Sequence, residues 1–459
     1  MKRSFEISPK LRAHNRVIER FNSKIFCSAP FTHMQFTENN QITACCKSKT
    51  SLGDCSNDKT EDIYNSPIAK ELRRFMLEGK KHPQCVSCWN VEKQHEGFPS
   101  GNRRDSNSQM YTDYGLAELE KNILPDGTLK NPIPGFVDLL WTNKCNFACL
   151  GCKPQFSTTI NDVYKTEFAT LQGFKLEDYY PDQQEWKSGN EEKIRFILEN
   201  KEQIKVIHLQ GGEPFLVDDV YDFLQSMIDV GLHKTCKLVA HTNGSIHKNR
   251  KGKDLIGDYL GHWGKNARIL MSIDGIGQRG EYIRYGWKEK VWRKTFDKLV
   301  ESDIDVATDS RANIFNLLTI PHFEDYIYNM CNKNKVDVNE PKLEVWQNET
   351  LNVALAKIHE PTRLKAIRAM KHVSYMPGWK NNSKKIIDWL ENDYMPRPKD
   401  VKSFIDGVIA LDKKRRINFH DTFPELHDWW ESAELLARSI DYKEDENWKD
   451  LEKVAVIVR

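Results

Sequence analysis

Three cysteines stand within one eight-residue stretch and carry the strongest chemical signal in the chain. Cys145, Cys149 and Cys152 follow directly after an apolar, strand-like segment. A four-iron cluster normally takes four protein thiolates, so three from one tight loop would leave one iron open to bind a substrate. In barrels of parallel strands, such chemistry lies in loops at the carboxyl ends of the strands. A structural zinc site is the alternative for this loop, but no fourth ligand is spaced for it.

A second group of cysteines lies nearer the N-terminus. Its members fall in a hairpin-like stretch and a Cys-x-x-Cys pair, at Cys27, Cys45, Cys46, Cys55, Cys85 and Cys88. Thiolates from two such places suit either a closed iron–sulfur cluster or a four-thiolate zinc site. Disulfides are disfavoured in a long cytosolic chain, so these grouped cysteines predict metal binding. The remaining two, Cys236 and Cys331, are interpreted as small buried hydrophobic residues.

Three short glycine-containing motifs follow the cysteine loop, each at the end of a predicted strand. They are Leu-Gln-Gly-Gly-Glu-Pro at 209–214, His-Thr-Asn-Gly at 241–244 and Met-Ser-Ile-Asp-Gly at 271–275. Glycines let the backbone approach a ligand closely, and the Glu213 carboxylate can accept hydrogen bonds from an ammonium group. Each motif alone is a common turn. Their order at regular intervals indicates one binding site.

A repeating strand–helix pattern positions these motifs. Apolar strands are predicted at 136–141, 204–209, 236–241, 267–273, 304–307 and 342–346, with helices between them at 218–230, 291–301 and 324–332. Most spacings are roughly 30–40 residues, the length of a strand, a crossover helix and their loops. Alternation of this kind favours a parallel sheet or barrel. An insertion is expected within 153–205, where the spacing is longer.

We therefore predict an α/β chain built around a partial (β/α)6 TIM-like barrel. The expected parts are a lead-in at 1–25, a cysteine-bearing hairpin and helix module at 26–106, a linker at 107–135, the barrel at 136–350 and a helical extension at 351–459. Within the module, strands are expected at 31–36 and 41–44 with a turn at 38–40. A helix is expected at 66–78, ending before Gly79.

The cysteine loop and the strand-end motifs together resemble the radical S-adenosylmethionine superfamily. The resemblance implies that Cys145, Cys149 and Cys152 hold a [4Fe-4S] cluster whose open iron chelates the methionyl amine and carboxylate of S-adenosylmethionine. An electron from the reduced cluster would break the sulfur–carbon bond, and the resulting 5′-deoxyadenosyl radical would abstract hydrogen from a substrate.

The same resemblance implies roles for residues at the strand ends. Amine contacts are expected from Gly211, Gly212 and Glu213, and ribose or carboxylate contacts from Thr242, Asn243, Ser272 and Asp274. Arg284 falls where members carry an arginine. The chain departs from the family at Gly151, where members usually have a bulky residue. Leu150 and Phe147 are the alternatives for covering the adenine.

The N-terminal cysteines resemble the twitch or SPASM-like auxiliary-cluster module. This resemblance implies a second iron–sulfur cluster, with zinc as the alternative. The favoured ligands are Cys27, Cys45, Cys85 and Cys88, with Cys46 the rival of Cys45 and Cys55 a bystander. Such modules more often follow the barrel, whereas this one precedes it.

Composition and family resemblance set the remaining expectations. With 68 basic and 66 acidic residues the chain lacks the basic excess of a nucleic-acid binder. It shows no apolar span and no secretory signal, so we expect a cytoplasmic protein without membrane contact. Relatives with auxiliary modules often modify ribosomally made peptides. A peptide or protein substrate is therefore our first choice and a small molecule, sugar or nucleoside the second, with flavodoxin or ferredoxin as electron donor. A zinc scaffold and a non-catalytic electron-transfer protein are the alternatives from other classes.

Overall fold

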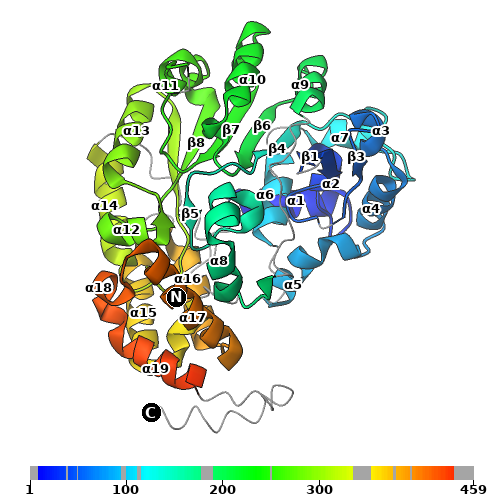
Figure 1. The fold of residues 1–459 in the computed structure, drawn as a ribbon. Helices are drawn as coiled ribbons and strands as arrows, with labels where there is room; N and C mark the ends of the chain where they lie inside the picture. Colours follow the sequence, from blue (N-terminus) through cyan, green and yellow to red (C-terminus); the bar gives the residue numbers. More distant parts are fainter. Residues whose placement is uncertain are drawn as a thin grey trace. The chain divides into compact units, whose positions relative to one another are not determined.

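The computed structural model describes residues 9–37, 40–48, 50–94, 100–110, 115–176, 190–248, 251–333, 353–375, 379–392 and 395–438 (Figure 1). The chain has a mixed α/β fold with a central parallel sheet. By its internal contacts it divides into two compact units. The first unit is Met1–Thr142, Trp186–Gly211 and Asp222–Val239, and the second is Asn143–Glu185, Gly212–Tyr221 and Ala240–Arg459.

The first unit contains five neighbouring strands in the order β6-β4-β1-β2-β3. Their bounds are β1 (His33–Phe36), β2 (Gln41–Thr43), β3 (Gly53–Asp54), β4 (Phe136–Thr142) and β6 (Val206–Gly211). β4 pairs in parallel with β6, as expected for consecutive strands of a β/α repeat. β1 also pairs in parallel with β4, while β2 returns antiparallel to β1. The N-terminal hairpin is therefore continuous with the sheet of its unit.

Helices complete the first unit. Their bounds are α1 (Pro9–Arg20), α2 (Ala29–Thr32), α3 (Thr60–Tyr64), α4 (Pro67–Leu77), α5 (Val86–Gln94), α6 (Gly101–Gln109), α7 (Leu116–Asn122) and α9 (Asn190–Glu199). α4 starts at the Ser66 cap, whose side chain accepts from the Ala69 N–H, and ends before Gly79 at φ +70°. Its Arg73 is fully buried and donates to the carbonyls of Pro30 and Gly127, which ties the helix to α2 and to the loop that contains Gly127.

The second unit carries the strands β8 (Ala267–Ser272) and β10 (Asp305–Asp309), which pair in parallel. β7 (Lys237–Thr242) and α10 (Asp218–Asp229) cross the boundary between the two units. A separate two-stranded ribbon joins β5 (Ala148–Cys149) to β9 (Arg284–Tyr285) in antiparallel register. This ribbon brings the middle of the cysteine loop to the segment that follows β8.

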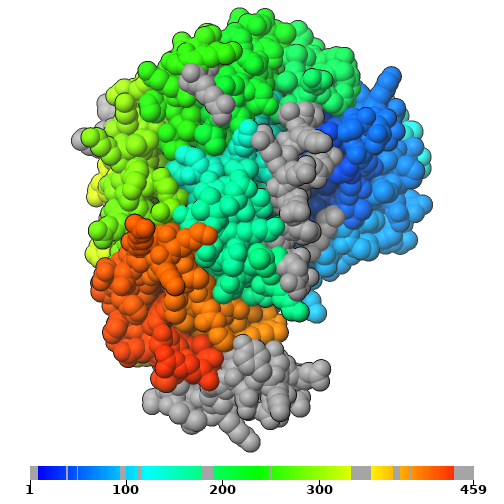
Figure 2. All heavy atoms as spheres, viewed as in Figure 1, coloured from blue at the N-terminus to red at the C-terminus, as the bar shows by residue number. Residues whose placement is uncertain are grey.

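Most helices of the second unit contribute to a large hydrophobic core. Their bounds are α8 (Lys165–Leu171), α11 (Leu255–Asp258), α12 (Gly277–Ile283), α13 (Glu289–Glu301), α14 (Ile320–Lys333), α15 (Glu360–Val373), α16 (Trp379–Glu391), α17 (Pro398–Arg415), α18 (Phe419–Thr422) and α19 (His427–Arg438). Figure 2 shows the atoms of the last helices, coloured orange to red, gathered in one region of the face in view.

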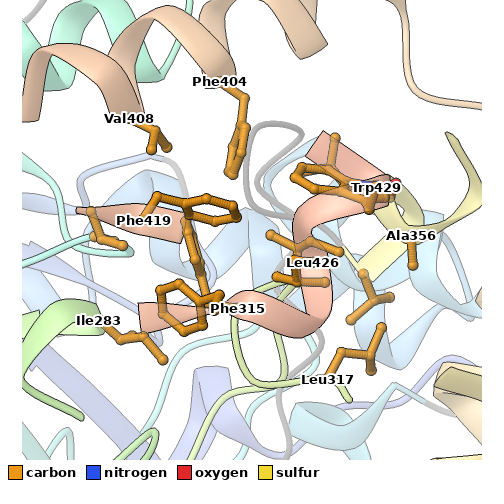
Figure 3. Packing of buried hydrophobic residues seen from close by; sticks show 14 of the residues in the cluster. Ile283, Phe315, Leu317, Ala356, Phe404, Val408, Phe419, Leu426 and Trp429 are labelled. Carbon is orange, nitrogen blue, oxygen red and sulfur yellow. Dashed lines mark hydrogen bonds between the residues drawn. The ribbon is translucent and has the colours of Figure 1, made fainter. Parts of the chain in front are cut away.

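Side chains from the C-terminal helices form this core together with residues of the β/α repeat. Phe404, Phe419 and Trp429 pack around Phe315 and Ile283 (Figure 3). Ala148 and Leu150 of the cysteine loop lie in the same core. α17 meets α8 so closely that a Cβ on Gly407 would lie 2.3 Å from the Cα of Leu171. The C-terminal helices are therefore part of the same packed unit as the cysteine loop.

Most of the expected elements are present with small shifts at their ends. The strands predicted at 136–141, 204–209, 236–241, 267–273 and 304–307 correspond to β4, β6, β7, β8 and β10. The sixth predicted strand at 342–346 and most of the turn at 38–40 lie outside the described residues. Residues 31 and 32 were expected in a strand and instead end α2, where Pro30 at the start of the helix favours that conformation. The predicted domain boundaries stay predictions. No helix in the described part of the chain is long and apolar enough to cross a membrane.

Candidate functional site

The cysteine loop is held in a compact shape by backbone contacts on both sides. Cys152 N–H donates to the carbonyl of Cys149 at 2.9 Å, which closes a tight turn. Leu150 N–H donates to the Ile283 carbonyl at 2.8 Å and extends the β5–β9 ribbon. At the other end, the Thr159 hydroxyl donates to the Cys145 carbonyl at 2.6 Å. These bonds fix the loop without using its three thiols.

The three thiols lie near one another and resist ionisation. Burial raises the pKa of Cys145, and the neighbouring charges of Cys149 and Cys152 raise that pKa further. Burial also raises the pKa of Cys152 to about 12, with Cys149 adding to the rise. Such thiols stay protonated at neutral pH unless a positive group compensates their thiolates. An iron–sulfur cluster supplies that compensation, so the residues fit it.

Arg284 and Asp274 form a buried pair beside Cys149. Arg284 Nε lies 2.8 Å from Asp274 Oδ2, and both side chains are nearly inaccessible to solvent. Arg284 Nη1 also approaches the Cys149 sulfur at 4.0 Å. Burial opposes the charge of Arg284, but Asp274 and Cys149 outweigh it and raise the pKa of the guanidinium above its ordinary value. A permanent positive charge therefore stands next to the middle thiol of the loop.

Glu213 ties the ends of two successive strands together. Its carboxylate is fully buried and accepts from the Thr242 hydroxyl at 2.9 Å and from the Asn243 N–H at 2.6 Å. Burial raises the pKa of Glu213 to about 7. Asn243 Nδ2 in turn donates to Asn146 Oδ1 at 2.9 Å, inside the cysteine loop. The structure thus brings the motifs at 209–214 and 241–244 to the cysteine loop.

The two glycines of the 209–214 motif are required by backbone packing. A Cβ on Gly211, at φ +134°, would lie 2.4 Å from the Thr142 carbonyl oxygen. A Cβ on Gly212 would lie 2.3 Å from the carbonyl oxygen of Lys144. The Glu213 N–H donates to that same Lys144 oxygen at 2.8 Å. The close approach that we assigned to a ligand is made here to the cysteine loop itself.

The other expected residues of the site lie at strand ends or in the core. Ser272 ends β8 and faces Asp309 in register. Asp274 accepts from the Arg311 N–H at 2.8 Å, just beyond the end of β10. Leu150 and Phe147 are both buried, at 1% and 2% exposure, and Leu150 packs into the hydrophobic core. The Leu150 side chain therefore contributes to the hydrophobic core of the second unit.

Four of the N-terminal cysteines gather in the first unit. Cys27 follows the loop after α1, Cys45 follows β2, Cys85 ends a short 3-10 helix at Pro83–Cys85, and Cys88 lies in α5. Burial raises the pKa of Cys45 to about 12, with the charges of Cys27 and Cys88 adding to it. Burial raises the pKa of Cys85 to about 12 in the same way, with Cys45 and Cys88 as neighbours. These are the four thiols favoured from the sequence.

The other two N-terminal cysteines differ from that group, one in its exposure and the other in its charged neighbours. Cys46 is exposed. Burial raises the pKa of Cys55 to about 11, and its charged neighbours are Lys193, Glu192 and Asp54. Within the described residues, no three His, Cys, Asp or Glu side chains are arranged to hold a single metal ion.

Two features of the structure were missed by sequence reasoning. Asp138 lies in the middle of β4 and accepts from Gln35 at 2.8 Å and from Gln210 at 2.6 Å, with His208 Nδ1 at 3.4 Å. An acid within the apolar run 136–141 is the signal that could have found it. The second feature is Arg415 of α17, whose guanidinium donates to the Ala148 carbonyl at 2.7 Å. Nothing local in the sequence marks that residue.

Family models match both cysteine regions. Residues 27–89 match the SPASM iron–sulfur cluster-binding domain, and residues 134–259 match a 4Fe-4S single cluster domain. These matches indicate two iron–sulfur cluster-binding regions. Together with the ordered motifs at 209–214, 241–244 and 271–275, they support the resemblance to radical S-adenosylmethionine proteins that carry a SPASM-type module.

Several solved structures are distantly similar. Streptococcus suis SuiB bound to S-adenosylmethionine is 13% identical, over 66% of this chain and 63% of its own, with a TM-score of 0.35. Native anSMEcpe with bound AdoMet is 12% identical, over 63% of this chain and 65% of its own, with a TM-score of 0.29. S. suis SuiB bound to its precursor peptide SuiA is 13% identical, over 58% of this chain and 64% of its own, with a TM-score of 0.28. The chain covers less than two thirds of each of these proteins. No curated protein matches the sequence.

Proposed function

We propose that this protein is an enzyme that reductively cleaves S-adenosylmethionine and uses the resulting 5′-deoxyadenosyl radical to abstract hydrogen from a peptide or protein. The single observation that carries the proposal is the cysteine loop of the second unit. Cys145, Cys149 and Cys152 supply three neighbouring thiols from one turn, and the loop contacts the strand-end motifs through Glu213 and Asn243. We also take the parallel sheet to be a partial (β/α)6 barrel.

In this proposal the cluster, when bound, supplies the electron and the chelating iron, and the chain supplies placement. The three cysteines of the loop hold the cluster and leave one iron for the cofactor. Thr242, Asn243, Ser272 and Asp274 lie at neighbouring strand ends and would orient the nucleoside and the carboxylate, while Gly211, Gly212 and Glu213 would bind the amine. Because Glu213 is fully buried and hydrogen-bonded to Thr242 and Asn243, it also holds the C-terminal end of β7 in position.

The N-terminal module favours a peptide or protein as the substrate. Its four gathered thiols, Cys27, Cys45, Cys85 and Cys88, would hold the auxiliary cluster. Relatives with such modules often act on ribosomally made peptides, and the family match at residues 27–89 supports that reading here. A flavodoxin or ferredoxin is the electron donor in this proposal.

Anaerobic reconstitution with iron and sulfide, followed by reduction with dithionite and addition of S-adenosylmethionine, tests the proposal. We expect 5′-deoxyadenosine by chromatography from the wild type and none from Cys149→Ala. Cys331→Ala is the matched control, because Cys331 is a lone buried cysteine of the same unit in α14 and should keep activity. A colourless protein that contains zinc would contradict the proposed function. So would a reduced cluster whose spectrum does not change when S-adenosylmethionine is added.

A further inference from the structure

A buried arginine from the C-terminal helices reaches the cysteine loop. Arg415 ends α17 and is only 6% exposed. Its Nη2 donates to the carbonyl of Ala148 at 2.7 Å, a residue 267 positions earlier in the chain. Ala148 directly precedes Cys149 and pairs with Tyr285 in the β5–β9 ribbon. Both residues belong to the second unit, so this contact lies within one compact body.

The surroundings of Arg415 compensate its charge only in part. Asp412, on the same helix, interacts with it electrostatically, and in the described part of the chain the two form no ion pair. Its guanidinium carbon lies 4.4 Å from the ring centre of Tyr285 and 5.0 Å from that of Tyr164. Within the part of the chain that the structure describes, Nε and Nη1 have no hydrogen-bond partner, and Arg415 forms no ion pair. Burying an unpaired charge costs several kcal/mol or more. The cost is offset where a negative group that the folded protein binds lies nearby.

The thiolate of Cys149 is one such group. Burial lowers the pKa of Arg415, while Tyr164, Tyr282 and Cys149 act in the opposite direction. Arg284 Nη1 lies 4.0 Å from the Cys149 sulfur, and Arg415 Nη2 donates to the carbonyl directly before Cys149. Two arginines therefore lie beside one cysteine. Arg284 comes from the segment after β8, and Arg415 comes from a helix that neither family model covers.

We propose that Arg415 is a positioning residue of the cysteine loop that fixes the Ala148 carbonyl and places a second positive charge beside Cys149, so that the cluster bound there is easier to reduce. This inference rests on the proposed function. Uptake of one electron from the low-potential donor adds one negative charge at the cluster. A fixed cation close to a ligand sulfur favours that more negative state, because net charge and hydrogen bonding near the sulfurs set the reduction potential.

The test compares the reconstituted full-length wild type with Arg415→Gln, Arg415→Met, Arg415→Lys and Arg397→Gln. Gln and Met remove the charge and keep a long side chain, while Lys keeps the charge. Arg397 precedes the first residue of the same helix, about 27 Å away along α17, and its partner is Asp400, so it is the matched control. Iron and sulfide content and the melting temperature of the metal-free protein verify that each variant folds and loads.

The readout is a redox titration followed by electron paramagnetic resonance, using the signal that shifts when S-adenosylmethionine is added. At a fixed solution potential we expect the ratio of reduced to oxidised cluster to fall about tenfold in Arg415→Gln or Arg415→Met, equal to about 59 mV for one electron. Arg415→Lys should lie close to the wild type, and Arg397→Gln should match it.

Two outcomes separate this inference from the proposed function. If the wild type lacks a signal that responds to S-adenosylmethionine, the proposed function itself fails. If the wild type shows that signal and a loaded neutral variant titrates at the wild-type potential, the role of Arg415 is refuted. Arg415→Met stands in for Arg415→Gln should the latter fail to fold. An equal shift in Arg415→Lys and the neutral variants would also refute the charge argument.

Discussion

Arg284 and Cys149 are register partners in a two-stranded ribbon, and Nη1 of the arginine lies 4.0 Å from the cysteine sulfur. The backbone hydrogen bonds that shape the cysteine loop therefore also fix the position of Arg284. Asp274 holds the other side of the guanidinium at 2.8 Å. The middle cysteine is thus fixed by backbone pairing and by a buried ion pair at once.

Replacing Arg284 with glutamine should destabilise the metal-free protein. The change leaves the Asp274 carboxylate buried without its cation, and breaking a buried pair typically costs about 3–5 kcal/mol. Denaturant unfolding measures the loss. Arg268→Gln is the control, because its pair with Asp305 is about one third exposed and should cost under about 1 kcal/mol. Equal losses in the two variants would contradict the role given to burial.

Gly212→Ala should disturb the cysteine loop without touching a thiol. The added methyl would lie 2.3 Å from the Lys144 carbonyl oxygen, and backbone must move to relieve it. Overpacking of this kind costs about 1–3 kcal/mol, and we expect a parallel loss of iron at the loop. Thermal melting and iron analysis test both effects. Gly257→Ala meets only ordinary contacts, at 3.7 Å from Asp254, and should behave as the wild type.

Cys88→Ala should separate the two clusters. Because Cys88 belongs to the thiol group of the first unit, its loss should lower iron content and impair folding or turnover of the true substrate. Cleavage of S-adenosylmethionine by folded protein should persist, because the cysteine loop is intact. Iron analysis and a 5′-deoxyadenosine assay give the two readouts. Cys55→Ala, from outside that group, should leave both unchanged. Loss of cleavage by well-folded Cys88→Ala protein would refute the separation.

Asp138 should make the metal-free protein less stable as the pH rises. Burial raises the pKa of Asp138 to about 7, above its ordinary value near 4. Between these values the folded chain keeps a proton that the unfolded chain has released, so stability falls with rising pH. The change is about 1.4 kcal/mol for each unit of pKa difference.

Melting temperatures at pH 5 and pH 8 check this dependence. Asp138→Asn, which cannot titrate, should show a smaller fall between the two values than the wild type. Asp305→Asn, at a partly exposed acid at the start of β10, should keep the wild-type fall. An unchanged fall in Asp138→Asn would show that another group controls the dependence.

The sequence predicted the elements whose signals are local. Apolar runs located β4, β6, β7, β8 and β10 to within a few residues, and the Ser66 cap and Gly79 bounded α4. Cysteine spacing located the loop at 145–152, since three thiols so close in sequence have little freedom to separate, whereas the N-terminal group, spread from Cys27 to Cys88, was located by family resemblance. Four of the six N-terminal thiols proved to be neighbours, in the combination that family resemblance favoured.

Features that depend on distant pairing could not be predicted. β1 and β4 are separated by about 100 residues along the chain, and no sequence pattern in either strand predicts that the two pair. Arg415 sits in a basic run, Lys413-Lys414-Arg415-Arg416, that resembles an exposed surface, yet one of its members is buried at the cysteine loop. The need for Gly212 is likewise set by the backbone of Lys144, which the fold brings alongside.

The parallel pairing of β1 with β4 bears on how this protein can be divided. Without the N-terminal hairpin, one side of β4 would present a row of open amide and carbonyl groups to water. Such a side readily recruits a foreign strand, so a shortened chain starting near residue 107 should self-associate. The N-terminal module therefore covers the edge of β4 in addition to carrying its cysteines. Removing it would both delete the auxiliary cluster site and expose an edge strand that is prone to aggregation.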